Sequence, residues 1–117
     1  PYMLMVANIT DSKKVEVTKN DEKLFGIEKL KVVRSTIPAV THVDFSARIQ
    51  TVHKETNYPF YRLIEEFKEQ TGCPILVNTS FNMHEEPIVN TPSEAIRCFK
   101  KGSLDVLVIE DFIVFND

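Results

Sequence analysis

Glycine is scarce in this sequence, with only Gly26, Gly72 and Gly102 among 117 residues. Phosphate-binding loops of the P-loop and dinucleotide-binding types need closely spaced glycines, because the backbone must approach the phosphate oxygens. Three glycines so far apart exclude both classes of nucleotide site. Gly72 and Gly102 instead follow predicted helices, where glycine commonly ends the helix.

Cysteine and positive charge are also limited. Cys73 and Cys98 lack the spacing of zinc or redox motifs, so we interpret them as small buried side chains in a reducing compartment. No apolar run approaches membrane-spanning length. The net charge of -3 offers no general attraction for nucleic acid. We therefore expect a cytoplasmic protein that binds neither membrane nor nucleic acid and meets an anionic ligand with a few placed cations.

The composition is that of an ordinary globular domain, with 43% hydrophobic and 26% charged residues. The length predicts a single compact domain over residues 1–117. The polar stretch 8–36 is predicted to be a loop-rich insertion in it. Because Pro1 is followed at once by a predicted strand, we expect the chain to be a piece of a longer protein.

Apolar periodicity and capping signals predict three helices. The first, Glu22 to Arg34, contains Gly26, which costs a helix up to about 1 kcal/mol. The second, Asn57 to Thr71, has apolar residues at helical spacing. The third follows the capping box Thr91 to Glu94, ends at Lys101, and is expected to turn Ala95, Ile96 and Phe99 inward.

Short apolar runs predict the strands, the last two of them joined as a hairpin. The fold class is therefore α/β (α+β), with a twisted mixed β-sheet and flanking helices. The predicted strands are Tyr2–Val6, Val40–Val43, Ser46–His53, Cys73–Val77, Leu104–Ile109 and Phe112–Phe115.

Two stretches carry the candidate ligand-binding residues. Asn78, Thr79, Ser80 and Asn82 follow the predicted buried strand, a position where open α/β sheets bind ligands. A guanidinium can grip a phosphate through two parallel hydrogen bonds, which makes Arg48 the candidate cation.

Period-two alternation places Arg48 and Gln50 on one face of their strand and Ala47 and Ile49 on the other. The alternatives are a surface salt bridge for Arg48, worth about 0–1 kcal/mol, and turn formation for the polar run. The residues alone favour neither ligand binding nor these structural alternatives.

Histidine offers two further candidates. His42 and Asp44 lie two residues apart on a predicted strand and would share a face, as a base and the group that orients it. A structural hydrogen bond is the favoured alternative. His84 with Glu85 and Glu86 has no second histidine nearby, so solvated charge is favoured over a metal site.

Several longer segments resemble a known family. IPAVTHVDFSARIQTV, YRLIEEF, TGCPILVNTSFN, EPIVNTPSEAIRCF and LDVLVIEDFIVFND are similar to the carboxyl-terminal part of O-carbamoyltransferases of the nodulation-protein and antibiotic-tailoring type. The segments occur in the family's order and spacing from Ile37 onward.

The resemblance implies a YrdC-like domain that binds carbamoyl phosphate, with ATP as co-substrate, and forms carbamoyl adenylate. A preceding N-terminal domain, which holds a metal ion, would pass the carbamoyl group to a hydroxyl-bearing small-molecule acceptor. We expect the present piece alone to be inactive and to hold no metal. The implied ligand contacts are Arg48, Asn78 and Ser80, with Gln50, Thr79, Asn82 and His42 as secondary candidates.

Two other functions compete with this one. The first is a non-catalytic nucleotide- or RNA-binding YrdC-like module, although the acidic composition argues against RNA. The second is a structural domain that only packs on the transfer domain.

Three positions depart from the family pattern, which usually has glycine where this chain has Phe45, Glu85 and Glu110. If these positions require a positive φ, each substitution costs about 1–2 kcal/mol or implies a reshaped loop.

Overall fold

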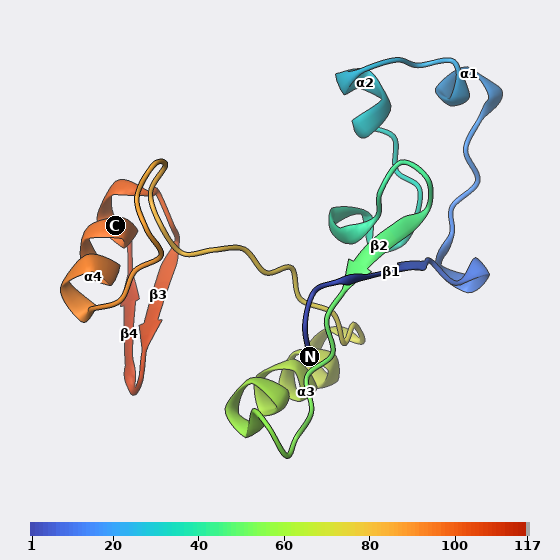
Figure 1. Ribbon diagram of the computed structural model, residues 1–117. Coiled ribbons are helices and arrows are strands. Elements are labelled where there is room, and N and C mark those ends of the chain that lie inside the picture. Colours follow the sequence, from blue (N-terminus) through green and yellow to red (C-terminus); the bar gives the residue numbers. More distant parts are fainter. Residues whose placement is uncertain (117) are drawn as a thin grey trace. The chain divides into compact units, whose positions relative to one another are not determined.

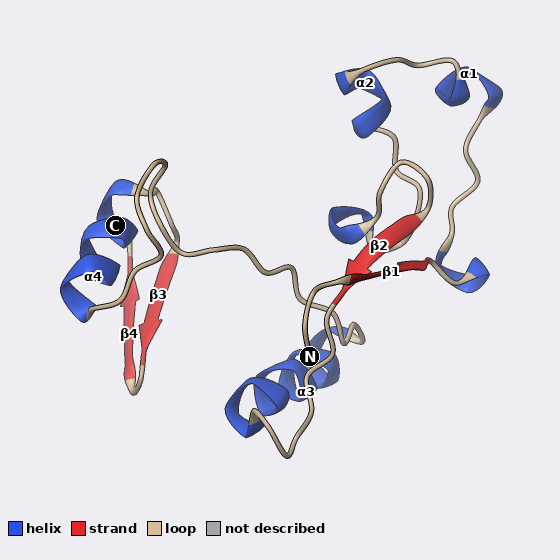
Figure 2. Cartoon of the chain, viewed as in Figure 1, coloured by secondary structure: helices blue, strands red, loops and turns tan. Residues whose placement is uncertain are grey.

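The computed structural model describes residues 1–116 and divides the chain into two compact units, Pro1–Val77 and Asn78–Asp117. Figure 1 labels the elements of each unit, and Figure 2 distinguishes helices from strands. The mixed α/β class is confirmed. The single mixed sheet is not observed, because the strands among residues 1–116 form two separate antiparallel pairs.

The first unit is organised around the antiparallel pair β1 (Met5–Asn8) and β2 (Ser46–Ile49). Ala7 lies opposite Ala47, which is buried, and the amide of Ile9 extends the pairing to the carbonyl of Phe45 at 2.8 Å. β1 lies further along the chain than the predicted Tyr2–Val6 strand. It is also exposed rather than buried, because within the described residues its only partner strand is β2.

The predicted insertion 8–36 returns on itself at an isolated antiparallel bridge between Lys14 and Ser35. The amide of Val15 donates to the carbonyl of Arg34 at 2.8 Å, and the amide of Thr36 donates to the carbonyl of Lys13 at 2.9 Å. These bonds close the base of the insertion. Its regular elements are the 3-10 helix η1 (Asp11–Lys13) and two single-turn helices, α1 (Lys19–Glu22) and α2 (Ile27–Leu30).

The single helix predicted over Glu22 to Arg34 is therefore wrong. Gly26 separates α1 from α2 with φ 60° and ψ -136°, a conformation that a helix cannot contain. Ile27 and Leu30 are exposed, so the expected apolar face is not buried within the unit.

Two predicted strands of the first unit are also not formed. Val40 is the last residue of the short 3-10 helix η2 (Pro38–Val40), and the chain enters a turn at Val43. Residues 73–77 are extended without a partner strand, and Ile75 and Val77 are exposed. A short apolar run becomes a strand only where a neighbour supplies its backbone hydrogen bonds.

The helix α3 (Tyr58–Thr71) confirms the prediction for that segment. Asn57 caps its first turn by accepting a hydrogen bond from the amide of Phe60 at 3.3 Å, and Pro59 lies in that turn. Gly72 ends the helix in the left-handed region, with φ 75°. Both ends are therefore set by local chemistry.

In the second unit, α4 (Pro92–Lys101) packs on the hairpin of β3 (Val106–Ile109) and β4 (Phe112–Phe115) (Figure 1). The predicted capping box is confirmed, since Thr91 and Glu94 exchange hydrogen bonds with each other's backbone. Ile96 is 44% exposed, so the prediction that it points inward is wrong. The core of the unit consists of Ala95, Cys98, Phe99 and Leu107.

Candidate functional site

The candidate cation Arg48 is on β2, directly across from Val6 of β1. Its side chain is exposed, and its guanidinium lies 3.2 Å from the sulfur of Met3. Among the described residues Arg48 has no acidic partner, so the surface salt bridge considered for it is not formed there. The buried neighbour Ala47 anchors the strand on the other face, as the alternation predicted, whereas Ile49 is 42% exposed.

Gln50 follows the last residue of β2 and is exposed. Its side-chain amide donates to the carbonyl of Pro1 at 2.6 Å, which holds the first residue beside the end of β2. This contact gives Gln50 a structural partner within the unit.

His42 and Asp44 lie ahead of β2 rather than on a strand, and both contact Ser46, the first residue of β2. His42 Nδ1 is 2.9 Å from Ser46 Oγ, and Asp44 Oδ1 accepts from Ser46 Oγ at 2.6 Å and from the Ser46 amide at 3.0 Å. The hydroxyl and the amide of Ser46 lower the pKa of Asp44 below its ordinary value. The network supports the structural role for this pair, because it closes the turn through Phe45, whose amide donates to the carbonyl of His42 at 3.1 Å.

Phe45, at the tip of this turn, has φ 62°. Glu85 and Glu110 have φ 63° and 49°, so all three positions at which the resemblance led us to expect glycine have a positive φ. The condition attached to these positions, a positive φ, is therefore met at all three. Ser103 has φ 51° as well, a position for which the sequence carried no signal.

The polar run Asn78, Thr79 and Ser80 opens the second unit and is exposed. Residues 73–77, directly before it, do not form the predicted strand. Asn82 is half-buried, and its side-chain amide donates to the carbonyls of Met83 and Glu86, both at 3.0 Å. Asn82 therefore organises the loop, whereas the three residues of the polar run are presented at the surface.

The predicted contacts are divided between the two units. His42, Arg48 and Gln50 belong to the first unit, and Asn78, Thr79, Ser80 and Asn82 belong to the second.

Two arginines were not singled out from the sequence. Arg34 is buried and donates to the carbonyls of Val32 and Lys29, both at 2.8 Å. Arg97 on α4 makes a two-pronged ion pair with Glu86. Neither had a sequence signal, because each partner's position depends on the path of an irregular loop.

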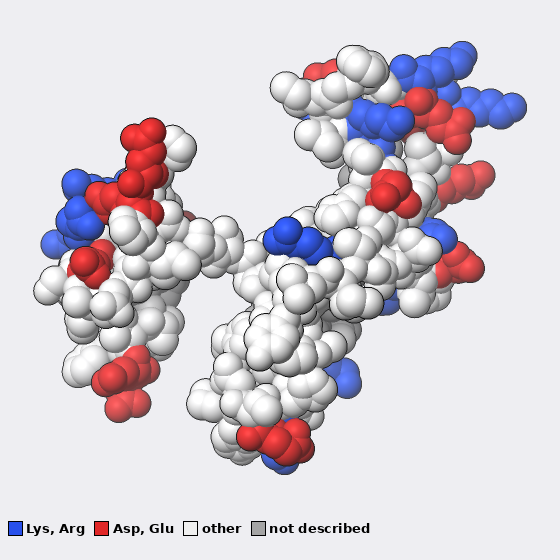
Figure 3. Space-filling model, viewed as in Figure 1, with Lys and Arg blue, Asp and Glu red and all other residues white. Residues whose placement is uncertain are grey.

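The first unit also contains an open cavity of about 450 Å³. Phe45 and Val43 line it together with residues of the predicted insertion. Lys14, Lys29 and Arg34 are balanced there by Glu16, Asp21 and Glu22. Equal numbers of cations and carboxylates do not make an anion site. Figure 3 shows the same mixture of signs around α1, rather than a continuous basic face.

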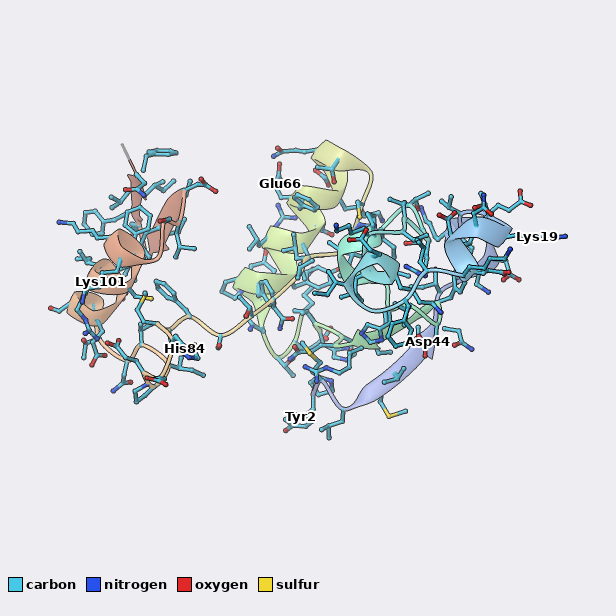
Figure 4. The ribbon with its side chains drawn as sticks, turned by 90° about the horizontal axis from the view of Figure 1, so that it is seen from above. Tyr2, Lys19, Asp44, Glu66, His84 and Lys101 are labelled. Atoms are coloured by element: carbon cyan, nitrogen blue, oxygen red, sulfur yellow. The ribbon has the colours of Figure 1, made fainter. Side chains whose placement is uncertain are left out.

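His84 and Glu85 are exposed on their loop (Figure 4 labels His84). Within residues 1–116, no three His, Cys, Asp or Glu side chains are grouped in a way that could hold a metal ion. Over the same residues, no helix combines the length and the apolar character needed to cross a membrane.

The family model described as "Carbamoyltransferase C-terminus" matches residues 1–116. The chain is 54% identical over 114 residues to the uncharacterized protein sll1178 of Synechocystis, which covers 97% of this chain and 18% of that protein. It is 48% identical over 80 residues to the nodulation protein NolO of Bradyrhizobium diazoefficiens, covering 68% of this chain and 15% of NolO.

A third relative is the 3'-hydroxymethylcephem-O-carbamoyltransferase of Amycolatopsis lactamdurans. It is 41% identical over 75 residues, which are 63% of this chain and 14% of that enzyme. The chain thus spans less than a fifth of the length of these three curated relatives.

Proposed function

The chain belongs to the family of carbamoyltransferase C-termini, and from this premise we propose that it is the part of an O-carbamoyltransferase that binds ATP and carbamoyl phosphate and forms carbamoyl adenylate. The observation that carries the proposal is the family match over residues 1–116. It is joined by the similarity to a relative whose name states O-carbamoyl transfer.

The proposed chemistry has two steps. Water releases the phosphate of carbamoyl phosphate and leaves carbamate. A carbamate oxygen then bonds to the α-phosphorus of ATP, and pyrophosphate leaves with the electron pair of the broken bond. Such a reaction needs positioned hydrogen-bond donors and positive charge around the phosphoryl oxygens more than it needs a protein nucleophile.

Arg48 is the proposed cation for these oxygens. Its guanidinium is exposed and has no carboxylate partner in residues 1–116, so a phosphate would not have to displace an ion pair. The strand β2, tied to β1 in register from Met5 to Asn8, gives the side chain a rigid base. Asn78 and Ser80 are the proposed neutral contacts. The N-terminal part of the full-length protein would pass the carbamoyl group to a hydroxyl-bearing acceptor.

The test is pyrophosphate release that depends on both ATP and carbamoyl phosphate, measured with the full-length protein. The variant Arg48→Ala is expected to lose about 100-fold or more of this activity, the size of loss seen when one positioned donor to a transition-state oxyanion is removed. Arg62→Ala is the matched control. Arg62 is also a partly exposed arginine, but it pairs with Glu65 on α3 and has no part in the proposed site. Wild-type turnover in Arg48→Ala would remove Arg48 from the mechanism.

A further inference from the structure

The loop after the polar run is fastened to α4 by an ion pair. Arg97 Nη1 donates to Glu86 Oε1 at 3.1 Å, and Nη2 donates to Oε2 at 2.8 Å. A two-pronged arginine–carboxylate contact fixes orientation as well as distance. The side chains are 48% and 35% exposed, so the contact lies at the surface of the unit and holds the loop without being part of its core.

The same loop also lies close to α4 near both ends of the helix. Near the amino end, Glu94 Oε2 accepts from the amide of Asn90 at 2.9 Å. At the carboxyl end, the sulfur of Met83 lies 3.8 Å from the position that a Cβ on Gly102 would occupy. The loop is therefore bonded to the helix near its amino end and at its middle, and Met83 lies beside its carboxyl end; Figures 1 and 4 both show the loop doubling back beside α4.

Hydrogen bonds within the loop connect the residues held against α4 to the residues at the start of the loop. Asn82 bridges the carbonyls of Met83 and Glu86, which closes the turn that contains Glu85. The amide of Val89 donates to the carbonyl of Phe81 at 3.0 Å. Phe81 directly follows Ser80 in the chain. The first residue of the loop that is held by this hydrogen bond is therefore the neighbour of the polar run.

We infer that Arg97, Glu86 and Asn82 are positioning residues that hold the run Asn78 to Ser80 in place for an anionic ligand. The inference rests on the proposed function, because that function assigns the polar run to phosphate binding. Arg97 is not assigned a contact with the ligand. It acts through Glu86 and the closed turn, whereas Arg48 would touch the phosphate itself.

The experiment uses the full-length protein and the variants Arg97→Ala, Arg97→Lys and the charge exchange Glu86→Arg/Arg97→Glu. The KM for carbamoyl phosphate is expected to rise about tenfold in Arg97→Ala, because misplacing a binding group by a fraction of an ångström weakens positioning. Arg97→Lys keeps the charge but loses the two-pronged geometry, so an intermediate KM is expected. The charge exchange should recover part of the loss. Arg62→Ala is the matched control, because it breaks an arginine–glutamate pair elsewhere.

Amide hydrogen exchange provides a readout that does not depend on activity. The amides of Glu86 and Val89 are expected to exchange faster in Arg97→Ala, while those of β3 and β4 keep their protection. An unchanged KM in an active Arg97→Ala protein, or unchanged exchange of the two loop amides, would overturn the inference. A different result is a wild type that releases no pyrophosphate while the amides of Glu86 and Val89 still exchange faster in Arg97→Ala. That result would contradict the proposed function and support only the role of Arg97 in holding the loop.

Discussion

In the turn between β3 and β4, the non-glycine residue Glu110 lies in the left-handed backbone region, which favours glycine. Glu110 and Asp111 form this two-residue connection, and Glu110 has φ 49° while Asp111 does not have a positive φ. Two-residue hairpins with a positive φ at the first position only belong to the class that favours glycine there. We therefore predict that Glu110→Gly stabilises the hairpin.

The size of the effect follows from two opposing contributions. A non-glycine residue in the left-handed region costs about 1–2 kcal/mol, and the substitution removes this cost. Glycine also increases the conformational entropy of the unfolded chain, which lowers the free energy of unfolding by about 0.5–1 kcal/mol. The Glu110 side chain is exposed and, among the described residues, makes no hydrogen bond or ion pair that would be lost. Taking the middle of each range, about 1.5 minus about 0.75 kcal/mol, the expected net gain is about 0.5–1 kcal/mol.

Amide hydrogen exchange of β3 and β4 measures this gain locally, which suits a chain with two compact units. Protection should rise about two- to fivefold, the ratio that corresponds to 0.5–1 kcal/mol. Asp111→Gly is the matched control, and it should lower protection because it adds freedom without relieving strain. Unchanged or lower protection in Glu110→Gly would refute the assignment of strain to Glu110.

Three further predictions concern the helix ends. Gly72→Ala should destabilise α3 by about 0.5–1 kcal/mol in urea unfolding, because a cost of about 1–2 kcal/mol for φ 75° is partly offset by the smaller freedom of alanine in the unfolded chain, and a Cβ there meets no atom within 4 Å; an unchanged midpoint would contradict this. Thr91→Ala should cost about 1 kcal/mol through loss of the α4 cap, and Thr91→Ser should restore most of it. Hydrogen bonds from the Asn90 amide and the Thr91 residue hold the pKa of Glu94 below its ordinary value of 4.5. The stabilisation of α4 by ionised Glu94 is therefore present above pH 4.5 and is lost as the pH falls through the lowered pKa. The protection of the α4 amides from hydrogen exchange should fall in acid in the wild type. This pH dependence should be weaker in Glu94→Gln.

Much of the local structure was predictable from short stretches of sequence. The ends of α3 at Asn57 and Gly72, the capping box at Thr91 and the hairpin around Glu110 were each expected, because capping and turn formation involve residues within about four positions of each other. The resemblance to carbamoyltransferases identified the family, and the positive φ raised as a condition for Phe45, Glu85 and Glu110 is observed at all three.

Apart from the helix interrupted at Gly26, the main failures concern segments whose structure depends on a distant partner. The run Cys73 to Val77 has strand composition, but its backbone finds no neighbouring strand in residues 1–116. The alternation in β2 correctly buried Ala47 and wrongly buried Ile49, because alternation defines two faces without showing whether anything covers them. For the candidate site, the role of Asn82 in closing its loop also needed the positions of two carbonyls that the sequence does not specify.

The sequence by itself determined the family, the α/β class and the helix ends, since these depend on residue identity at fixed spacing. Only the tertiary structure decided that β1 pairs with β2 across some forty residues, that Arg34 is buried against two carbonyls, and that Arg97 reaches Glu86. The physical reason is that such pairings require loop closure and packing, and many loop paths have nearly the same closure entropy. Which path is followed is therefore set by the contacts formed at its end.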